Sequence, residues 1–272
     1  MSDIALLFPG QGSHEDGMQD RYAGSSLLER GLDLLDYNPF DHLADGTRYQ
    51  QPALFLCGVA DWEMAGRPVP AAAAGHSLGE YAALVAAGAL LFEDALLLVD
   101  ARAAAMATAA ERVPGAMVAM LGGDPADVAA LATQLGLVIA NDNAPGQIVL
   151  AGPREAVEDA AGRARDISAR ARILDVSGAF HSPLMQPAAA TLRSKLAGTP
   201  VSQPLFPVYS NGSAAPFIDI RSELGENLLR CVRWRETLLA MHDDGINDFK
   251  ECGPGQVLTG MVKRTIRTEA PA

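Results

Sequence analysis

Residues 70–90 read PAAAAGHSLGEYAALVAAGAL, a short apolar run, a glycine-flanked serine and a second apolar run. The run of alanines after Pro70 is typical of a buried strand, and the segment that follows Ser77 favours a helix. Gly75 and Gly79 lie two positions on either side of the serine, where they allow a sharp turn that exposes its hydroxyl. The pattern indicates a nucleophile elbow in an α/β fold, although Ser77 could also simply cap the helix.

The same alternation of strands and helices continues outside this stretch. Before it, we predict a strand at 4–9 and a helix at 52–65; after it, helices at 80–90 and 92–112. Towards the C-terminus we predict a helix at 183–198, a strand at 206–211, and a last helix and strand. This alternation implies a mostly parallel sheet with helices on both faces.

The middle of the chain has a different rhythm. Strands are predicted at 115–121, 137–142, 147–152 and 171–177, with helices at 125–136 and 154–168. The order β-α-β-β-α-β is that of a ferredoxin-like unit. We therefore predict a large α/β domain of residues 1–113 and 178–272, interrupted by a small ferredoxin-like domain at residues 114–177.

Composition and charge narrow the function classes. The 272 residues are 49% hydrophobic and 20% charged, as in ordinary globular proteins. The net charge of −12 argues against nucleic acid and against an anionic membrane surface as partners. No apolar run reaches the ~20 residues that cross a bilayer, and no basic segment precedes the first apolar run as in a secretory signal. We expect a cytoplasmic monomer.

The cysteines and histidines point to serine chemistry without a metal. Three widely spaced cysteines have no metal-ligand spacing and fit a reducing compartment, so we expect no metal and no bound cofactor. A serine nucleophile needs a base. Of the five histidines, His181 lies at the junction of the two predicted domains, a natural place for a cleft. His181 is therefore the predicted base; the others are His14, His42, His76 and His242.

A series of motifs in this order resembles one known family. The motifs are PGQGS at 9–13, GHSLGEY at 75–81, RAAAM at 102–106, NDNAPGQIVLAG at 141–152, GAFHSPLM at 178–185, PVYSN at 207–211, VRW at 232–234 and GPGQVLTG at 253–260. The chain resembles the malonyl-CoA:acyl carrier protein transacylases and the related stand-alone acyltransferases of polyketide synthesis. The resemblance covers nearly the whole chain and implies a hydrolase-like α/β domain with a ferredoxin-like insert.

The resemblance implies a two-step acyl transfer. Ser77 would take a malonyl group from the substrate malonyl-CoA as an ester and pass it to the phosphopantetheine thiol of an acyl carrier protein. His181 would act as base towards Ser77 and then as acid towards the departing thiol. The backbone N–H groups of Gln11 and Leu78 would form the oxyanion hole.

Substrate choice is expected to depend on Arg102. A guanidinium holds a carboxylate through paired hydrogen bonds, and malonyl carries a free carboxylate where acetyl does not. The match of Arg102 and Met106 to the family favours a pocket over a surface arginine. Phe180 beside the histidine, and Leu78, would narrow the pocket against a branched acyl group.

For each of two asparagines, a second interpretation remains open. Asn227 stands where the family usually has a glutamine that helps to orient the histidine, a task that a backbone carbonyl can also perform. Asn143 matches an asparagine that lines the cleft, although the turn in NAPG would favour asparagine in any case.

The expected carrier protein is usually acidic, as is this chain, so docking requires a local basic patch. Candidates are Arg230, Arg233 and Arg235, and the group Lys263, Arg264 and Arg267; solvated helix faces are the alternative.

Two other functions remain open at this point. An editing hydrolase of the same fold would remove acyl groups from carrier proteins, but it has no use for a carboxylate clamp at Arg102. A catalytically silent carrier-protein-binding partner would not need Gln11, Ser77 and His181 together. The sequence does not distinguish fatty acid synthesis from polyketide synthesis.

Overall fold

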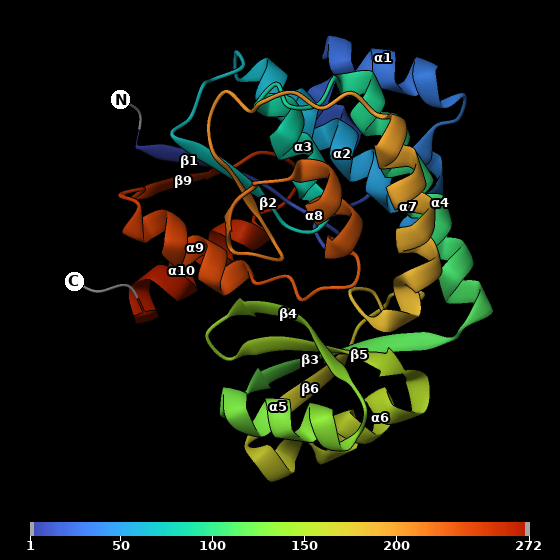
Figure 1. Ribbon diagram of the computed structural model, residues 1–272, viewed down its shortest axis with the longest axis vertical. Coiled ribbons are helices and arrows are strands. Elements are labelled where there is room, and N and C mark those ends of the chain that lie inside the picture. The colour runs from blue at the N-terminus through green and yellow to red at the C-terminus, as the bar shows by residue number, and fades with distance from the viewer. Residues whose placement is uncertain (1–2, 270–272) are drawn as a thin grey trace.

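The computed structural model describes residues 3–269 and contains two separate sheets (Figure 1). The larger sheet has the strand order β8-β7-β2-β1-β9. Its strands are β1 (Ile4–Phe8), β2 (Ala72–Gly75), β7 (Val208–Ser210), β8 (Ala215–Pro216) and β9 (Asp248–Glu251). All neighbours pair in parallel except β8, which lies antiparallel at the edge. The mostly parallel sheet is thus confirmed.

Helices cover both faces of this sheet, because successive side chains of its central strands point to opposite sides. Leu6 and Phe8 of β1 belong to the main apolar core with α2, α3 and α4, whereas Ala5 and Leu7 pack with α9 and α10. The helices are α1 (Ser26–Leu35), α2 (Thr47–Met64), α3 (Gly79–Ala86), α4 (Phe92–Arg112), α7 (Gln186–Gly198), α8 (Ile220–Asn227), α9 (Trp234–Asp243) and α10 (Val257–Glu269). Short 3-10 turns span Met18–Tyr22, Pro39–Asp45, Ala164–Ile167 and Pro183–Met185.

The second sheet is antiparallel and has the order β4-β5-β3-β6. Its elements follow one another as β3 (Gly115–Gly122), α5 (Pro125–Gln134), β4 (Val138–Ala144), β5 (Gln147–Pro153), α6 (Arg154–Arg163) and β6 (Ala169–Ile173). Apolar side chains of one sheet face pack against α5 and α6, and those of the other face join the main core. The predicted ferredoxin-like order is confirmed, while the domain extents 1–113, 114–177 and 178–272 stay a prediction.

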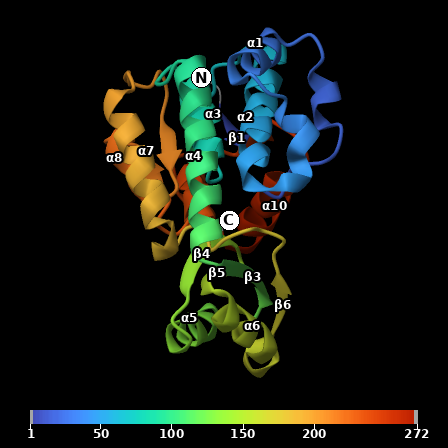
Figure 2. The same cartoon turned by 90° about the vertical axis from the view of Figure 1, so that its right-hand side faces the viewer.

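The two parts are joined through β4 as well as through the chain itself. Val232, just before α9, donates its N–H to Ala140 O at 2.8 Å and accepts from Asp142 N at 2.9 Å. The long helix α4 runs from the large part down to the small sheet, as Figure 2 shows. The edge of the small sheet therefore lies against the segment that leads into α9.

The structure differs from the prediction in several elements, among them α1, which was not predicted, and α2, which begins at Thr47 instead of residue 52. The last strand of the small sheet is at Ala169–Ile173 instead of 171–177, because a 3-10 turn and Ser168, with φ of 57°, reverse the chain earlier. The helix after Ser77 ends at Ala86 and not at 90, since Gly88 adopts φ of 69°. The described part of the chain ends in the helix α10, which was not predicted; its first turn is held by the Glu251 carboxylate.

Candidate active site

Ser77 stands on a strained turn between β2 and α3. Its φ is 52°, a left-handed conformation that costs a non-glycine residue free energy and is common at functional sites. A Cβ on Gly75 would lie 1.8 Å from the carbonyl carbon of Gly79, and one on Gly79 would lie 2.1 Å from Phe8 O. Gly75 is therefore required for the tightness of the turn itself, and Gly79 for the close approach of the turn to β1. The predicted elbow is present.

The tertiary fold brings His181 to this turn. Its Nε2 lies 2.8 Å from Ser77 Oγ. Its Nδ1 faces two backbone carbonyls, Asn227 O at 2.8 Å and Arg230 O at 3.1 Å. Since carbonyls only accept, Nδ1 carries the proton and Nε2 is left to accept from the serine hydroxyl. Burial and the nearby Arg102 guanidinium lower the pKa of His181 to about 3, which keeps the ring neutral.

Arg102 reaches the same hydroxyl from α4. It is 2% exposed, and its Nη2 donates to Ser77 Oγ at 2.9 Å. Its Nη1 donates to Gln51 Oε1, and its Nε has no hydrogen-bond partner among the described residues. In that part of the chain no carboxylate forms an ion pair with it. The predicted pocket location of Arg102 agrees with this burial, and the guanidinium keeps unused donors beside Ser77.

Gln51, on α2, was not singled out from the sequence. It accepts from Arg102 and donates to Thr47 Oγ1 at 2.7 Å and to Met106 Sδ at 3.3 Å. Thr47 Oγ1 in turn donates to Gln11 Oε1 at 3.0 Å. No sequence signal marks Gln51. Its amide is fully buried, but a sequence does not distinguish a buried glutamine from an exposed one.

The remaining predicted residues differ in their burial and hydrogen bonds. The backbone N–H groups of Gln11 and Leu78 donate no hydrogen bond to any described residue. Phe180 is 5% and Met106 is 2% exposed. Asn143 is buried and contacts His76, with Oδ1 2.8 Å from Nε2. The Nε2 atom of His76 is thus paired with Asn143, and the histidine on Ser77 Oγ is His181.

Asn227 contacts His181 only through its backbone carbonyl. Its side-chain amide points instead to Glu80, with Nδ2 at 2.9 Å from Oε1 and 3.1 Å from Oε2. The side chain is thus not the group that contacts the histidine. Glu80 and Asn211, which the sequence analysis also did not identify, complete this buried network: Asn211 Oδ1 accepts from Ser77 N at 2.6 Å.

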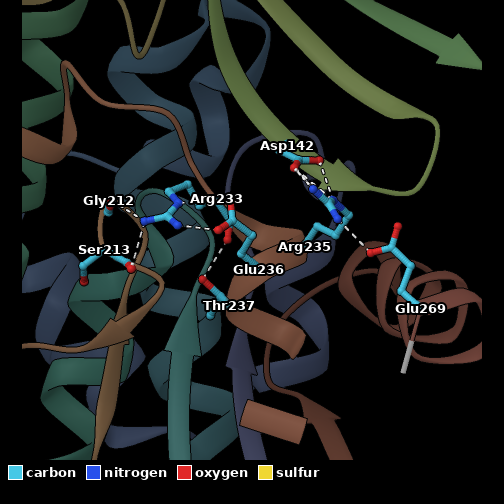
Figure 3. Close-up of polar contacts among 8 residues, drawn as sticks. All are labelled: Asp142, Gly212, Ser213, Arg233, Arg235, Glu236, Thr237 and Glu269. Carbon is cyan, nitrogen blue, oxygen red and sulfur yellow. Dashed lines mark hydrogen bonds and ion pairs between the residues drawn. The ribbon is translucent and has the colours of Figure 1, made fainter. Parts of the chain in front are cut away.

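Of the candidate basic residues, Arg233 and Arg235 are already paired. Figure 3 shows Arg233 between Glu236 and the carbonyls of Gly212 and Ser213. Arg235 contacts Asp142 of β4 and Glu269 of α10 at 2.8 Å each (Figure 3). These contacts fix α9 against the small sheet. Arg230, Lys263, Arg264 and Arg267 remain exposed.

Comparison with known proteins identifies the family. The model described as "Acyl transferase domain" matches residues 5–272. The chain belongs to this acyl transferase family. It is 39% identical to the malonyl CoA-acyl carrier protein transacylase of Bacillus subtilis, over 98% of this chain and 92% of that one. A polyketide biosynthesis malonyl CoA-acyl carrier protein transacylase from Bacillus velezensis is 36% identical, over 99% and 98% of the two chains.

The fold agrees with that of solved acyl transferases. The malonyl CoA-acyl carrier protein transacylase of Coxiella burnetii superposes with a TM-score of 0.91 at 37% identity, covering 98% of this chain and 92% of that one. A malonyl-transacylase solved in complex with a type II polyketide synthase acyl carrier protein gives 0.90 at 36% identity, covering 98% and 94%.

Two features are absent from residues 3–269. No cluster of histidine, cysteine, aspartate or glutamate side chains has the arrangement of a metal site. No helix in that range is both long enough and apolar enough to span a membrane.

Proposed function

We propose that this acyltransferase moves a malonyl group from malonyl-CoA to the phosphopantetheine thiol of an acyl carrier protein. One observation carries the proposal: Arg102, buried and without a carboxylate partner among residues 3–269, lies within hydrogen-bond distance of Ser77 Oγ. A buried guanidinium is costly unless an anion satisfies it. The acyl group that meets it should therefore carry its own carboxylate.

The first half-reaction acylates Ser77. His181 Nε2 takes the hydroxyl proton as Oγ attacks the thioester carbonyl, and the backbone N–H groups of Gln11 and Leu78 donate to the developing oxyanion. The tetrahedral intermediate expels CoA, whose sulfur takes the proton from His181. The carbonyl groups of Asn227 and Arg230 hold Nδ1–H and stabilise the transient imidazolium.

The second half-reaction reverses these roles. The carrier-protein thiol enters, gives its proton to His181 Nε2 and attacks the malonyl ester. Ser77 leaves and recovers the proton. These steps use only side chains, backbone amides and the two thioesters, so we propose that no metal or bound cofactor takes part.

The Arg102 guanidinium would sort the acyl groups. Nη1 is held by Gln51, which leaves Nε and Nη2 as a two-donor edge for the malonyl carboxylate. Phe180 and Leu78 would limit the width of the pocket, at about 1–3 kcal/mol for one added methyl group. With free cysteines at 57, 231 and 252, we propose that the enzyme works in the reducing cytoplasm.

Intact mass spectrometry tests the proposal. Brief exposure to malonyl-CoA should add one malonyl group to the parent and none to Ser77→Ala. Arg102→Ala should lose malonyl and accept acetyl, whereas Arg112→Ala, an exposed arginine on the same helix, should behave as the parent. Release of free acid from acyl carrier protein without transfer would instead indicate an editing hydrolase, and no turnover at all would indicate a binding partner.

A further inference from the structure

Glu80 is a buried carboxyl group that the proposed chemistry does not use. It lies in the first turn of α3 and is 2% exposed. In the described part of the chain no basic side chain forms an ion pair with it. Burying a carboxyl group is expensive unless its oxygens are well hydrogen-bonded. Its partners therefore indicate what this residue does.

Two asparagines supply those hydrogen bonds. Asn211 N donates to Glu80 Oε1 at 2.7 Å, and Asn227 Nδ2 donates to Oε1 at 2.9 Å and to Oε2 at 3.1 Å. The two partners come from different segments, the end of β7 and the end of α8. The Glu80 carboxyl group thus bridges these two segments, which are also joined directly where Asn227 Nδ2 donates to Ser210 Oγ at 3.1 Å.

Each asparagine also holds one member of the Ser77–His181 pair. Asn211 Oδ1 accepts from Ser77 N at 2.6 Å, and its Nδ2 donates to Gly75 O at 2.7 Å. Asn227 O accepts from His181 Nδ1 at 2.8 Å. The Glu80 carboxyl group therefore contacts neither the Ser77 hydroxyl nor the His181 ring. One asparagine stands between it and each of them.

We propose that Glu80 is a positioning residue, which holds the Ser77 turn and the His181 ring in register through Asn211 and Asn227. The inference rests on the proposed acyl-serine chemistry. Ser77 and His181 both have a strained backbone, with φ of 52° and 55°, and therefore need contacts that keep them in this conformation. Strained conformations persist only where the surrounding contacts enforce them.

The network can serve a neutral carboxyl group as well as an anionic one. Burial raises the pKa of Glu80 to about 8, against the opposing effect of its hydrogen bonds and of Arg102. A neutral carboxyl must donate its O–H. Asn227 Oδ1 is buried without a partner among the described residues. If the side-chain amide of Asn227 rotates by about 180°, Oδ1 faces Glu80 and accepts the carboxyl hydrogen.

Two substitutions of equal size test the proposal. Glu80→Gln keeps an acceptor for Asn211 N and a polar partner for Asn227, whereas Glu80→Met keeps the volume and removes both. The rate constant for Ser77 modification is measured by intact mass, with malonyl-CoA and with a fluorophosphonate probe. We expect Glu80→Met to lower both constants about 10- to 100-fold. Glu80→Gln should remain within about threefold of the parent.

A matched control separates positioning from stability. Glu63 holds the start of α1 through Ser25, Ser26 and Leu27 and, among residues 3–269, makes no hydrogen bond to Ser77, His181, Asn211 or Asn227. Glu63→Met should lower the melting temperature and leave the rate constants of the folded protein unchanged. In a Ser77→Ala background, Glu80→Met should change the Kd for malonyl-CoA by less than about threefold, because Glu80 makes no hydrogen bond or ion pair with Arg102 and acts on it only through a weaker charge interaction. A folded Glu80→Met variant that reacts at the parent rate overturns the proposal.

A second variant covers the case in which Glu80→Met does not fold. Asn227→Leu removes the amide but keeps the backbone carbonyl that contacts His181, and it should also slow both reactions. A parent rate for this variant overturns the proposal. The two reagents test the two proposals separately. If the parent protein reacts with the fluorophosphonate but not with malonyl-CoA, the proposed function is wrong. The fluorophosphonate rates still measure the effect of Glu80 on Ser77.

Discussion

Nη2 of Arg102 lies 2.9 Å from Oγ of Ser77, on the hydroxyl that also lies 2.8 Å from His181 Nε2. A single oxygen thus meets a fixed positive charge on one side and a neutral base on the other. Burial is the main cause of the lowered pKa of His181, and the Arg102 charge lowers it further. The group that would recognise a carboxylate and the group that would accept a proton are therefore electrostatically coupled.

Gln51 should control how well Arg102 receives a carboxylate. Gln51→Leu removes the acceptor of Nη1, so the guanidinium loses its fixed orientation, and we expect malonylation to slow about tenfold. Gln51→Glu places a carboxylate beside Nη1 and should slow it further, because the internal ion pair competes with the substrate. Rate constants for malonyl and acetyl transfer to Ser77 measure both. Equal malonyl rates for Gln51→Leu and Gln51→Glu would contradict this account.

The rate of malonyl-serine formation should begin to fall only at a pH well below the usual pKa of histidine. The pKa of His181 is lowered to about 3, so its neutral form persists at pH 5, where a histidine of pKa 6.5 would lose activity about 30-fold. We expect kcat/KM for malonyl-serine formation to change little between pH 7 and 5. In Arg102→Ala, followed by acetyl-serine formation from acetyl-CoA, the fall in rate should move to higher pH, since the substitution removes a cation that disfavours protonation of His181.

The same shift has a consequence for stability. The folded protein binds fewer protons at His181 than the unfolded chain does, so the stabilisation is present above pH 6.5 and is lost as the pH falls towards 3. In urea unfolding, His181→Ala should therefore lose less stability than the parent over that window. An identical slope for the two proteins would argue against a lowered pKa.

The elbow glycines should be intolerant of a methyl group. Gly75→Ala and Gly79→Ala each place Cβ about 2 Å from backbone atoms, so the turn or β1 must move. We expect losses of several kcal/mol or no folded protein, on the order of the largest single-substitution effects. Gly260→Ala on α10, where a Cβ meets nothing within 4 Å, should instead stabilise by about 1 kcal/mol. Urea denaturation provides the comparison.

Carrier-protein docking should depend on the exposed basic residues and not on the paired ones. Lys263→Glu with Arg267→Glu on α10 should slow malonyl transfer to the carrier protein severalfold at low salt, and less at high salt, because the attraction is long-range. Serine malonylation by malonyl-CoA should not change. Lys195→Glu is the control, because α7 and α10 pack on opposite faces of the larger sheet (Figure 1). A slower transfer by that control alone would place docking elsewhere.

Much of the fold could be predicted from local signals. The helix at Phe92–Arg112 was predicted to the residue, and the βαββαβ order followed from periodicity and turns. The last strand of the small sheet was displaced because its pairing with β3 starts where Ser168 reverses the chain, and sequence does not specify that point. α10 was missed although its apolar and charged residues alternate at helical spacing.

Site residues could be predicted from the sequence only where they belong to a recognised motif. Ser77, His181, Arg102 and the glycines were identified, and the structure places them together. Gln51, Glu80 and Asn211 were not, because a polar residue within an apolar run gives no sign of its partner. Asn227 was identified, but the sequence did not show that its backbone oxygen, and not Oδ1, contacts His181. The side chain is instead packed against Gly212, where a Cβ would lie 2.4 Å from Asn227 Oδ1.

The sequence by itself determined the local conformations: the buried strand, the glycine-flanked turn and the helix around Ser77, because steric limits and side-chain periodicity act between near neighbours. Only the tertiary structure decided which groups meet. Ser77 and His181 are 104 residues apart, and Glu80 and Asn227 are 147 apart. Such contacts are set by how the sheets and helices pack, which fixes distances to tenths of an ångström that no local pattern encodes.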